Sequence, residues 1–232
     1  MAILYPPIET IKNLRQKPTE GELHALDVLS RTFGDTYEIF FQPFLNGDMP
    51  DIIIMKRGVG VYILEVKDWD LEKYYLDDSR QWRVKTRDGK DPIIKSPLDQ
   101  VKHYKSNLFN IHVRGLLEEK IKNSTVWWLV KHGVYFHKAK SQDLKNFVSN
   151  GINPETADDN EAKYLKYLKG YDLMGFDSMN PTGISNTFQR RGMNSKSLMF
   201  NEKLYDNFFR ILSPPKHYIE DQKPIIFSKN QK

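Results

Sequence analysis

Two acidic side chains and a lysine near the start of the sequence have types and spacing that could bind a metal ion. Asp51 directly follows Pro50, and Glu65 and Lys67 are separated by one residue in the apolar run 59–69. Residues i and i+2 of a strand point to the same face, so we expect Glu65 and Lys67 to share a face. Two converging carboxylates suit Mg²⁺ or Mn²⁺, because such an ion keeps several waters and contacts a phosphate. The ion would lower the pKa of a bound water, and the lysine could orient that water and stabilise the transition state.

Two β-rich segments must position these residues. Residues 51–56 and 59–69 are rich in isoleucine and valine, and Arg57–Gly58 between them is typical of a two-residue hairpin turn. We therefore expect two antiparallel neighbouring strands. A twist or splay of these strands would be needed to bring Asp51 towards Glu65.

The flanking segments alternate between helical and strand patterns. The helical patterns cover 20–33, 97–109 and an amphipathic stretch to about 121, and the strand patterns cover 37–45, 81–86 and 125–136. Ser96 can cap the second of these helices, and Pro97 suits its first turn. The order predicts an α/β fold with a mixed central sheet flanked by helices.

Composition excludes several classes of site. The 232 residues include no cysteine, which excludes disulfides, cysteine nucleophiles and thiolate metal sites and is compatible with a cytoplasmic location. The N-terminal residues have no basic segment followed by an apolar run, so we expect no signal peptide. No stretch approaches the roughly 20 apolar residues that span a bilayer, so we expect no membrane partner.

The charge is unevenly distributed along the chain. Residues 1–79 carry 8 Lys and Arg against 14 Asp and Glu, a net charge of −6, whereas residues 80–122 carry 11 against 5, a net charge of +6. An acidic segment followed by a basic one suits a carboxylate metal site beside a phosphate-binding surface, although ordinary surface charge would give the same counts. The basic candidates for contact with nucleic acid are Arg80, Arg83, Lys85, Lys102 and Lys105.

Four short motifs, taken together and in order, carry a resemblance to a known family. They are Gly21-Glu22, Pro50-Asp51, Glu65-Val66-Lys67 with Trp69, and Pro97-Leu98-Asp99-Gln100. This order resembles the nuclease-related domain (NERD) family of the PD-(D/E)xK nuclease superfamily, over about residues 19–137. The chain departs from many members at one point, since Asp51 is followed by three isoleucines where those members place a second acidic residue.

The resemblance implies a restriction-endonuclease-like fold and a role for each matching residue. Asp51 and Glu65 would be metal ligands, with the Val66 carbonyl as a third. Lys67 would be the catalytic lysine. Glu22 would lie near the metal or its waters, and Gln100 would complete the site through hydrogen bonds.

Each of these residues also has a simpler interpretation when it is taken alone. Glu65 and Lys67 could be a solvent-facing pair on an edge strand, and Asp51 could cap a turn. Glu22 could be a first-turn helix charge that the helix dipole favours, and Gln100 could be a solvated helix residue. Their joint occurrence in family order favours the site. The aromatic run 125–136 includes Trp127 and Trp128, which we expect to pack in the core rather than to stack on bases.

A polar connection after Ser149 predicts a boundary between residues 1–149, the nuclease-like domain, and 150–232, a small helical extension or linker. Residues 212–217 resemble the join between a NERD domain and a superfamily 1 helicase, and 227–232 resemble the start of the helicase motor. We therefore expect the N-terminal part of a longer nuclease–helicase. The alternative is a complete protein with a frayed tail.

These observations support two functional hypotheses. The favoured one is a Mg²⁺-dependent nuclease that hydrolyses phosphodiester bonds, in DNA, with a helicase domain in the same polypeptide and a role in DNA processing or defence against foreign DNA. The second is a non-catalytic module that uses the same fold to bind nucleic acid or a partner protein. Cleavage that depends on Mg²⁺ or Mn²⁺ and is lost in EDTA would separate the two.

Overall fold

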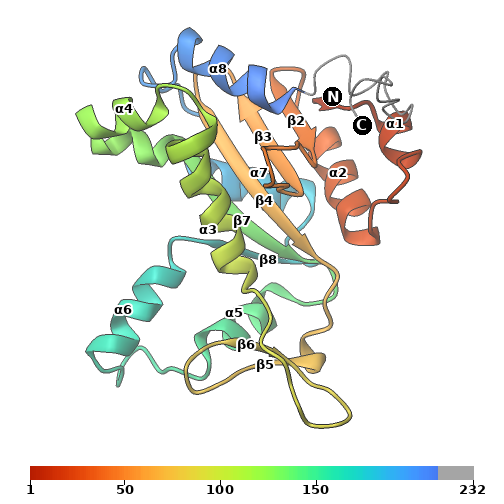
Figure 1. Ribbon diagram of the computed structural model, residues 1–232, viewed down its shortest axis with the longest axis vertical. Helices are drawn as coiled ribbons and strands as arrows, with labels where there is room; N and C mark the ends of the chain where they lie inside the picture. Colours follow the sequence, from red (N-terminus) through yellow and green to blue (C-terminus); the bar gives the residue numbers. More distant parts are fainter. Residues whose placement is uncertain (214–232) are drawn as a thin grey trace, which may run out of the picture.

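The computed structural model describes residues 1–213, so the segment with the resemblance to a helicase motor lies outside the described residues. A six-stranded mixed sheet, with strand order β1-β2-β3-β4-β7-β8, forms the centre of the molecule (Figure 1). Its strands are β1 (Ile3–Tyr5), β2 (Tyr37–Phe41), β3 (Ile52–Lys56), β4 (Gly60–Lys67), β7 (Val130–Phe136) and β8 (Asp172–Gly175). Strands β2, β3 and β4 are antiparallel neighbours, whereas β1, β7 and β8 each join the sheet in parallel.

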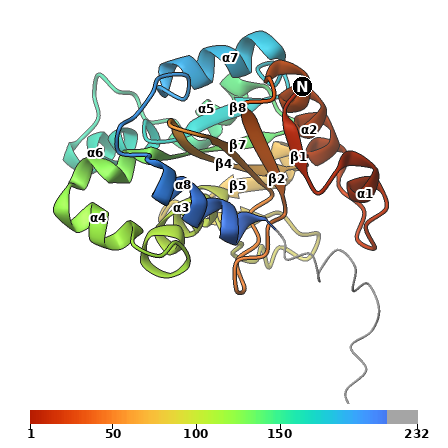
Figure 2. The same ribbon diagram turned by 90° about the horizontal axis from the view of Figure 1, so that it is seen from above.

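Helices cover both faces of this sheet, as Figure 2 shows from above. The helices are α1 (Ile8–Lys12), α2 (Glu20–Thr32), α3 (Pro97–Asn107), α4 (Leu116–Lys122), α5 (Ser141–Ser149), α6 (Asp159–Leu168), α7 (Pro181–Arg190) and α8 (Glu202–Leu212). Three short helical segments, η1 (Leu71–Lys73), η2 (Leu108–His112) and η3 (Ser124–Leu129), complete the helical part of residues 1–213. The architecture confirms the predicted α/β fold with a mixed central sheet flanked by helices.

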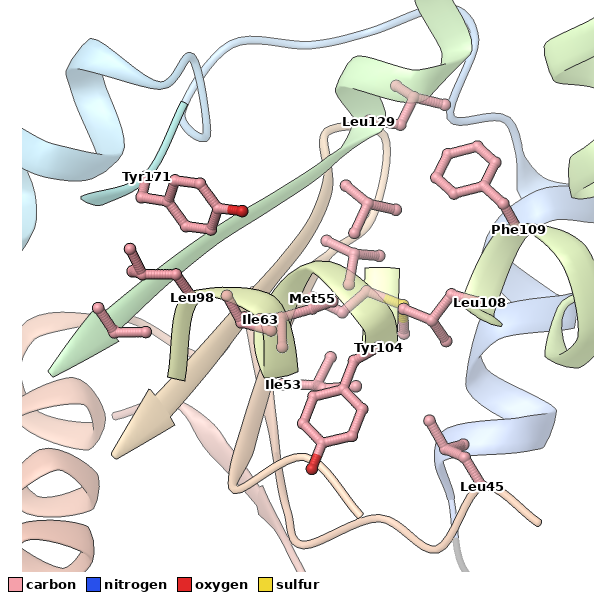
Figure 3. Close-up of a cluster of buried hydrophobic side chains, with 14 of the residues drawn as sticks. Leu45, Ile53, Met55, Ile63, Leu98, Tyr104, Leu108, Phe109, Leu129 and Tyr171 are labelled. Carbon is pink, nitrogen blue, oxygen red and sulfur yellow. The ribbon is translucent and has the colours of Figure 1, made fainter. Parts of the chain in front are cut away.

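The period-two pattern of the strands divides the core into two layers. Ile53, Ile63 and Val134 point to one face of the sheet and pack with α3 and α8, where Figure 3 shows Ile53 and Ile63 behind the helix that carries Tyr104. Ile54 and Leu64 point to the opposite face and pack with α2 and α7. Residues of both layers are almost fully buried, so each large side chain contributes about 1.5–3 kcal/mol of burial free energy.

The hairpin between β3 and β4 has a longer loop than the predicted two-residue turn. Lys56 pairs with Gly60, which leaves three residues, Arg57–Val59, in the loop. The Val59 N–H donates to the Lys56 carbonyl at 3.1 Å, and Gly58, with φ 70°, is the third residue of this β-turn, where a positive φ favours glycine. The prediction of a two-residue turn was therefore wrong by one residue.

Other strands depart from the predicted pattern in number and position. The predicted strand 81–86 is β6 (Trp82–Val84), which pairs with β5 (Tyr74–Leu76) in a separate two-stranded sheet outside the central one. Packing of Trp82 on Phe147, with ring centroids 5.0 Å apart, attaches this hairpin to α5. The segment 125–136 is strand only from residue 130, because η3 precedes it.

The part of the chain after Ser149 is mainly helical, and it also supplies an edge strand of the central sheet that was not predicted from the sequence. Strand β8 pairs in parallel with β7, and Phe188 of α7 packs in the same core layer as Leu64. Residues 150–213 therefore complete the sheet and its covering helices. Within residues 1–213, none of the helices combines the length and the apolar character needed to cross a membrane.

Candidate active site

Asp51 and Glu65 lie opposite each other where β3 begins and β4 approaches its end. Ile52 pairs with Leu64, so the next residues across the hairpin are Asp51 and Glu65. Asp51 lies two residues from Ile53, and Glu65 lies two residues from Ile63. Because side chains alternate along a strand, both acidic residues project to the same α3 face of the sheet as these isoleucines. A carboxylate oxygen of Asp51 also accepts a 2.7 Å hydrogen bond from the backbone N–H of Val66, which fixes its position.

Lys67 is held against Glu65 on the same face of β4. Its ammonium lies 2.5 Å from Oε1 of Glu65, and the side chains are 15% and 0% exposed, respectively. The second oxygen, Oε2, is buried and receives no hydrogen bond from residues 1–213. A buried oxygen without a donor is costly, and a cation bound between the two carboxylates would relieve that cost.

The pKa values of the acidic pair also favour a bound cation. Burial, followed by the negative charge of Glu65, raises the pKa of Asp51 well above its usual range. Burial also raises the pKa of Glu65, although Lys67 opposes the shift. The protein alone therefore stabilises the two carboxylate anions poorly. A divalent cation bound to them would favour the ionised forms and lower both pKa values.

The donor set fits a sparsely coordinated magnesium rather than a metal enclosed by protein ligands. Among residues 1–213, no three or more His, Cys, Asp or Glu side chains are grouped to hold a metal. An ion at Asp51 and Glu65 would take the Val66 carbonyl and waters as its remaining ligands. Mg²⁺ accepts such an arrangement, because it dehydrates reluctantly and commonly binds through one or two carboxylates.

Glu22 is buried beside this pair but is already engaged by hydrogen bonds. It forms a capping box with Thr19 at the start of α2, accepting the Thr19 N–H at 2.7 Å. Its other oxygen accepts from the Gln42 side chain at 2.8 Å, and the Gln42 backbone N–H donates to the Asp51 carbonyl at 2.8 Å. The charge of Glu22 contributes to the raised pKa of Asp51. Glu22 therefore acts on the acidic pair through its field and through Gln42.

Gln42 is a residue at the site that the sequence analysis missed. It has φ 44°, a left-handed conformation that is unusual for a residue other than glycine. Its side chain connects the end of β2 to Glu22, and its backbone N–H connects the same point to Asp51. No motif or spacing in the sequence marks this residue, because its role depends on a bend after β2.

The glycine before Glu22 is required by close packing of α2 on the ends of β4 and β7. A Cβ atom added to Gly21 would lie 2.9 Å from Cβ of His137 and 3.0 Å from the carboxylate oxygens of Asp68. Asp68 also accepts the Gly21 backbone N–H at 3.0 Å. This contact ties the first turn of α2, with Glu22, to the strand that carries Glu65.

Gln100 is hydrogen-bonded to Tyr104, one turn later on α3. Its side-chain amide donates to the Tyr104 hydroxyl at 2.8 Å, and that hydroxyl donates to the Met49 carbonyl at 3.3 Å. Burial, and then the negative charges of Glu65 and Asp51, raise the pKa of Tyr104 to about 12, while the bond from Gln100 opposes the shift. The tyrosine hydroxyl thus lies within the field of the acidic pair. Gln100 makes no direct hydrogen bond to either carboxylate within residues 1–213.

The basic residues predicted to contact nucleic acid fall into two groups. In the first group, Arg83 donates to Asp77 at 2.7 Å and to the Asp91 carbonyl at 2.9 Å, and Lys85 donates to the Glu72 carbonyl at 2.8 Å. Arg80 in the same region lies 4.4 Å from the Tyr164 ring centroid. The second group, Lys102 and Lys105, is on α3. The first group stabilises the β5–β6 hairpin, and only the second shares a helix with Gln100.

Comparison with known proteins gives one match. The family model described as NERD, nuclease-related domain, matches residues 17–137, slightly more than half of the chain. The matched range runs from the turn before α2 to His137 and so contains every residue of the acidic site. No curated protein matches the chain significantly. The same holds for solved structures.

Proposed function

Because the chain belongs to the nuclease-related domain family, we propose that it is a Mg²⁺-dependent nuclease that hydrolyses phosphodiester bonds in DNA. The observation that carries the proposal is the buried Asp51–Glu65 pair with Lys67 bound to one carboxylate oxygen of Glu65. Two facing carboxylates and a lysine on one sheet face are what phosphate hydrolysis by a sparsely coordinated metal requires.

Each residue of the site has a proposed role in this reaction. Asp51, Glu65 and the Val66 carbonyl would hold Mg²⁺ or Mn²⁺, which would supply a water of lowered pKa and neutralise charge on the phosphate. Lys67, at the exposed side of Glu65, would position the attacking water and stabilise the negative charge that develops on phosphorus-bound oxygens. The water oxygen forms the new bond to phosphorus, the bond to one ester oxygen breaks, and the leaving oxygen takes up a proton.

Glu22 and Gln100 would support this geometry without entering the bond changes. Glu22 keeps Gln42, and through it the Asp51 backbone, in place. Gln100 orients the Tyr104 hydroxyl beside the acidic pair. Both would therefore act as positioning residues.

The wider setting of this activity is also a proposal. The resemblance of residues 227–232 to a helicase motor supports a nuclease–helicase with both activities in one polypeptide, serving DNA processing or defence against foreign DNA. Such a protein would act in the cytoplasm, with which the cysteine-free sequence is compatible.

The test measures cleavage of circular and linear DNA with Mg²⁺, with Mn²⁺ and in EDTA. We expect cleavage with either metal only, and a loss of about 10²- to 10³-fold in rate for Glu65→Gln and for Lys67→Met. The control variants are Asp27→Asn and Arg31→Gln, an ion pair exposed on α2, which should cut like the parent.

Circular dichroism and thermal unfolding would show that each variant is folded. Parental rates in both Glu65→Gln and Lys67→Met would refute the catalytic assignment. Binding of DNA without cleavage under any metal condition would instead support the non-catalytic module.

A further inference from the structure

Lys105 is a buried lysine without an acidic partner. Its side chain is 1% exposed on α3, and its ammonium lies 4.2 Å from the ring centroid of Trp127 and 5.4 Å from that of Trp128. It forms no ion pair with a carboxylate of residues 1–213. Buried charges in folded proteins are normally paired, so this position lacks an anion.

The groups around Lys105 are also cationic. Lys120 of α4 also lies over Trp127, with its ammonium 4.5 Å from the ring centroid. Burial, and then the charges of Lys131, Arg191 and Lys120, lower the pKa of Lys105 to about 7. Of these neighbours only Arg191 is neutralised within residues 1–213, by Asp172 at 2.9 Å.

His132 on β7 is embedded in the same cluster. Burial, followed by Lys105, Arg191 and Lys102, lowers its pKa to about 3. Its Nδ1 atom is buried and receives no hydrogen bond from residues 1–213. Burial is the main cause of both shifts, and the neighbouring cations add to it.

An exposed aromatic ring stands at the edge of this cluster. Trp127 packs on Phe109, with ring centroids 4.7 Å apart, as the sequence analysis expected of both tryptophans. Trp128 is instead 59% exposed, so the expectation that it packs in the core was wrong. Lys131 donates a hydrogen bond to the Trp128 backbone carbonyl, which places a lysine at the residue that carries the exposed ring. We name Lys102, Lys120, Lys131 and Trp128, which surround the buried Lys105, the Lys–Trp patch.

The patch and the acidic site share one face of the sheet. His132 pairs with Ile63 of β4, two residues before Glu65. It lies two residues before Val134 on β7, so its side chain points to the same α3 face. Helix α3 carries Gln100 and Tyr104 on the side of the acidic site and the exposed Lys102 at the patch. A ligand lying along α3 could therefore contact both.

We propose that the Lys–Trp patch binds single-stranded nucleic acid, with phosphates on its lysines and an unpaired base stacked on Trp128. The choice of nucleic acid as ligand rests on the proposed nuclease function. Lysines alone would hold any phosphate backbone, but an exposed indole selects a strand with accessible base faces. In a duplex those faces are stacked on neighbouring base pairs.

Binding is measured in EDTA, by fluorescence anisotropy of a labelled 15-nucleotide oligothymidine and of a duplex of equal length. We expect the parent to prefer the single strand and Trp128→Ala to weaken that binding about tenfold, while Trp128→Phe retains most of it. Lys120→Gln and Lys131→Gln should each reduce the log–log salt slope by about 0.7. Phe176→Ala, with a 46% exposed ring, and Lys12→Gln on α1 are the matched controls and should bind like the parent.

Unchanged single-strand affinity in a folded Trp128→Ala variant would overturn the proposal, as would equal losses for single strand and duplex. The assay contains no metal and no cleavage, so it is independent of catalysis. A parent that binds through the patch but never cuts would refute the nuclease and keep the patch. A parent that cuts DNA while the patch variants bind single strands like the parent would refute the patch and keep the nuclease.

Discussion

The ammonium of Lys67 lies 2.5 Å from one carboxylate oxygen of Glu65, while the other oxygen of the same carboxylate receives no hydrogen bond from residues 1–213. One oxygen of Glu65 is thus satisfied by Lys67, and the other has no donor within residues 1–213. This asymmetry separates the lysine from the position that a cation would take between the carboxylates.

Metal binding should therefore stabilise the folded protein. With Mg²⁺ at about ten times its dissociation constant, the free energy of unfolding should rise by about 1.4 kcal/mol, a shift of about 3–5 °C in Tm. Asp51→Asn should abolish the shift, because it removes one of the two carboxylates. Thermal unfolding with and without Mg²⁺ checks this, and Asp27→Asn serves as the control that keeps the shift.

Gly21→Ala should destabilise the protein and impair cleavage although it removes no functional group. The added methyl would lie 2.9 Å from Cβ of His137 and 3.0 Å from the carboxylate oxygens of Asp68. We expect a loss of about 1–3 kcal/mol in the free energy of unfolding, because backbone and strand must shift. Urea unfolding measures it. Gly34→Ala, at a position with no atom within 4 Å of the added Cβ, is the matched control.

Gln100 and Tyr104 should behave as one unit. Tyr104→Phe removes the hydroxyl that joins Gln100 to the Met49 carbonyl, and the lost hydrogen bonds should cost about 1 kcal/mol of stability. If Gln100 acts through this hydroxyl, Gln100→Ala will lower the cleavage rate in the parent but add little in the Tyr104→Phe background. Additive losses in this double-mutant cycle would show that Gln100 acts independently.

Lys105→Met should stabilise the protein, most strongly near neutral pH. The pKa of this lysine falls from 10.5 to about 7 on folding. Between these values the unfolded chain binds a proton that the folded chain does not, so the penalty is full below pH 7 and disappears as the pH rises past 10.5. We expect a gain of about 2–4 kcal/mol at pH 7 and a smaller one at pH 9.5, from urea unfolding at both values. Lys122→Met, an exposed lysine paired with Glu119, should show no such pH-dependent gain.

The strand pattern was enough to place Glu65 and Lys67 on one face, because side chains alternate strictly along a strand. The position of Asp51 was not predictable in the same way. A two-residue turn at Arg57–Gly58 would have set Asp51 opposite Leu64. Only a twist or splay of the two strands would then have brought Asp51 to Glu65. The three-residue loop shifts the register by one, and Asp51 meets Glu65 without distortion.

Features that depend on contacts distant in sequence could not be predicted. Strand β8 has four residues, and its assignment rests on pairing with β7. The link from Glu22 through Gln42 to Asp51 depends on three segments meeting. The exposure of Trp128 depends on η3 replacing the expected strand, since a helical turn directs Trp127 and Trp128 to different environments.

The loop Arg57–Val59 makes the site vulnerable to changes in gene length. Deleting or inserting a single codon in this loop would leave Asp51, Glu65 and Lys67 encoded, yet where the loop keeps three residues the pairing moves by one and Asp51 turns to the opposite side of the sheet from Glu65. A two-codon insertion moves the pairing by two under the same condition, which leaves Asp51 and Glu65 on one face. In a scan of codon insertions and deletions across this loop, we expect loss of cleavage for odd changes and partial retention for the two-codon insertion.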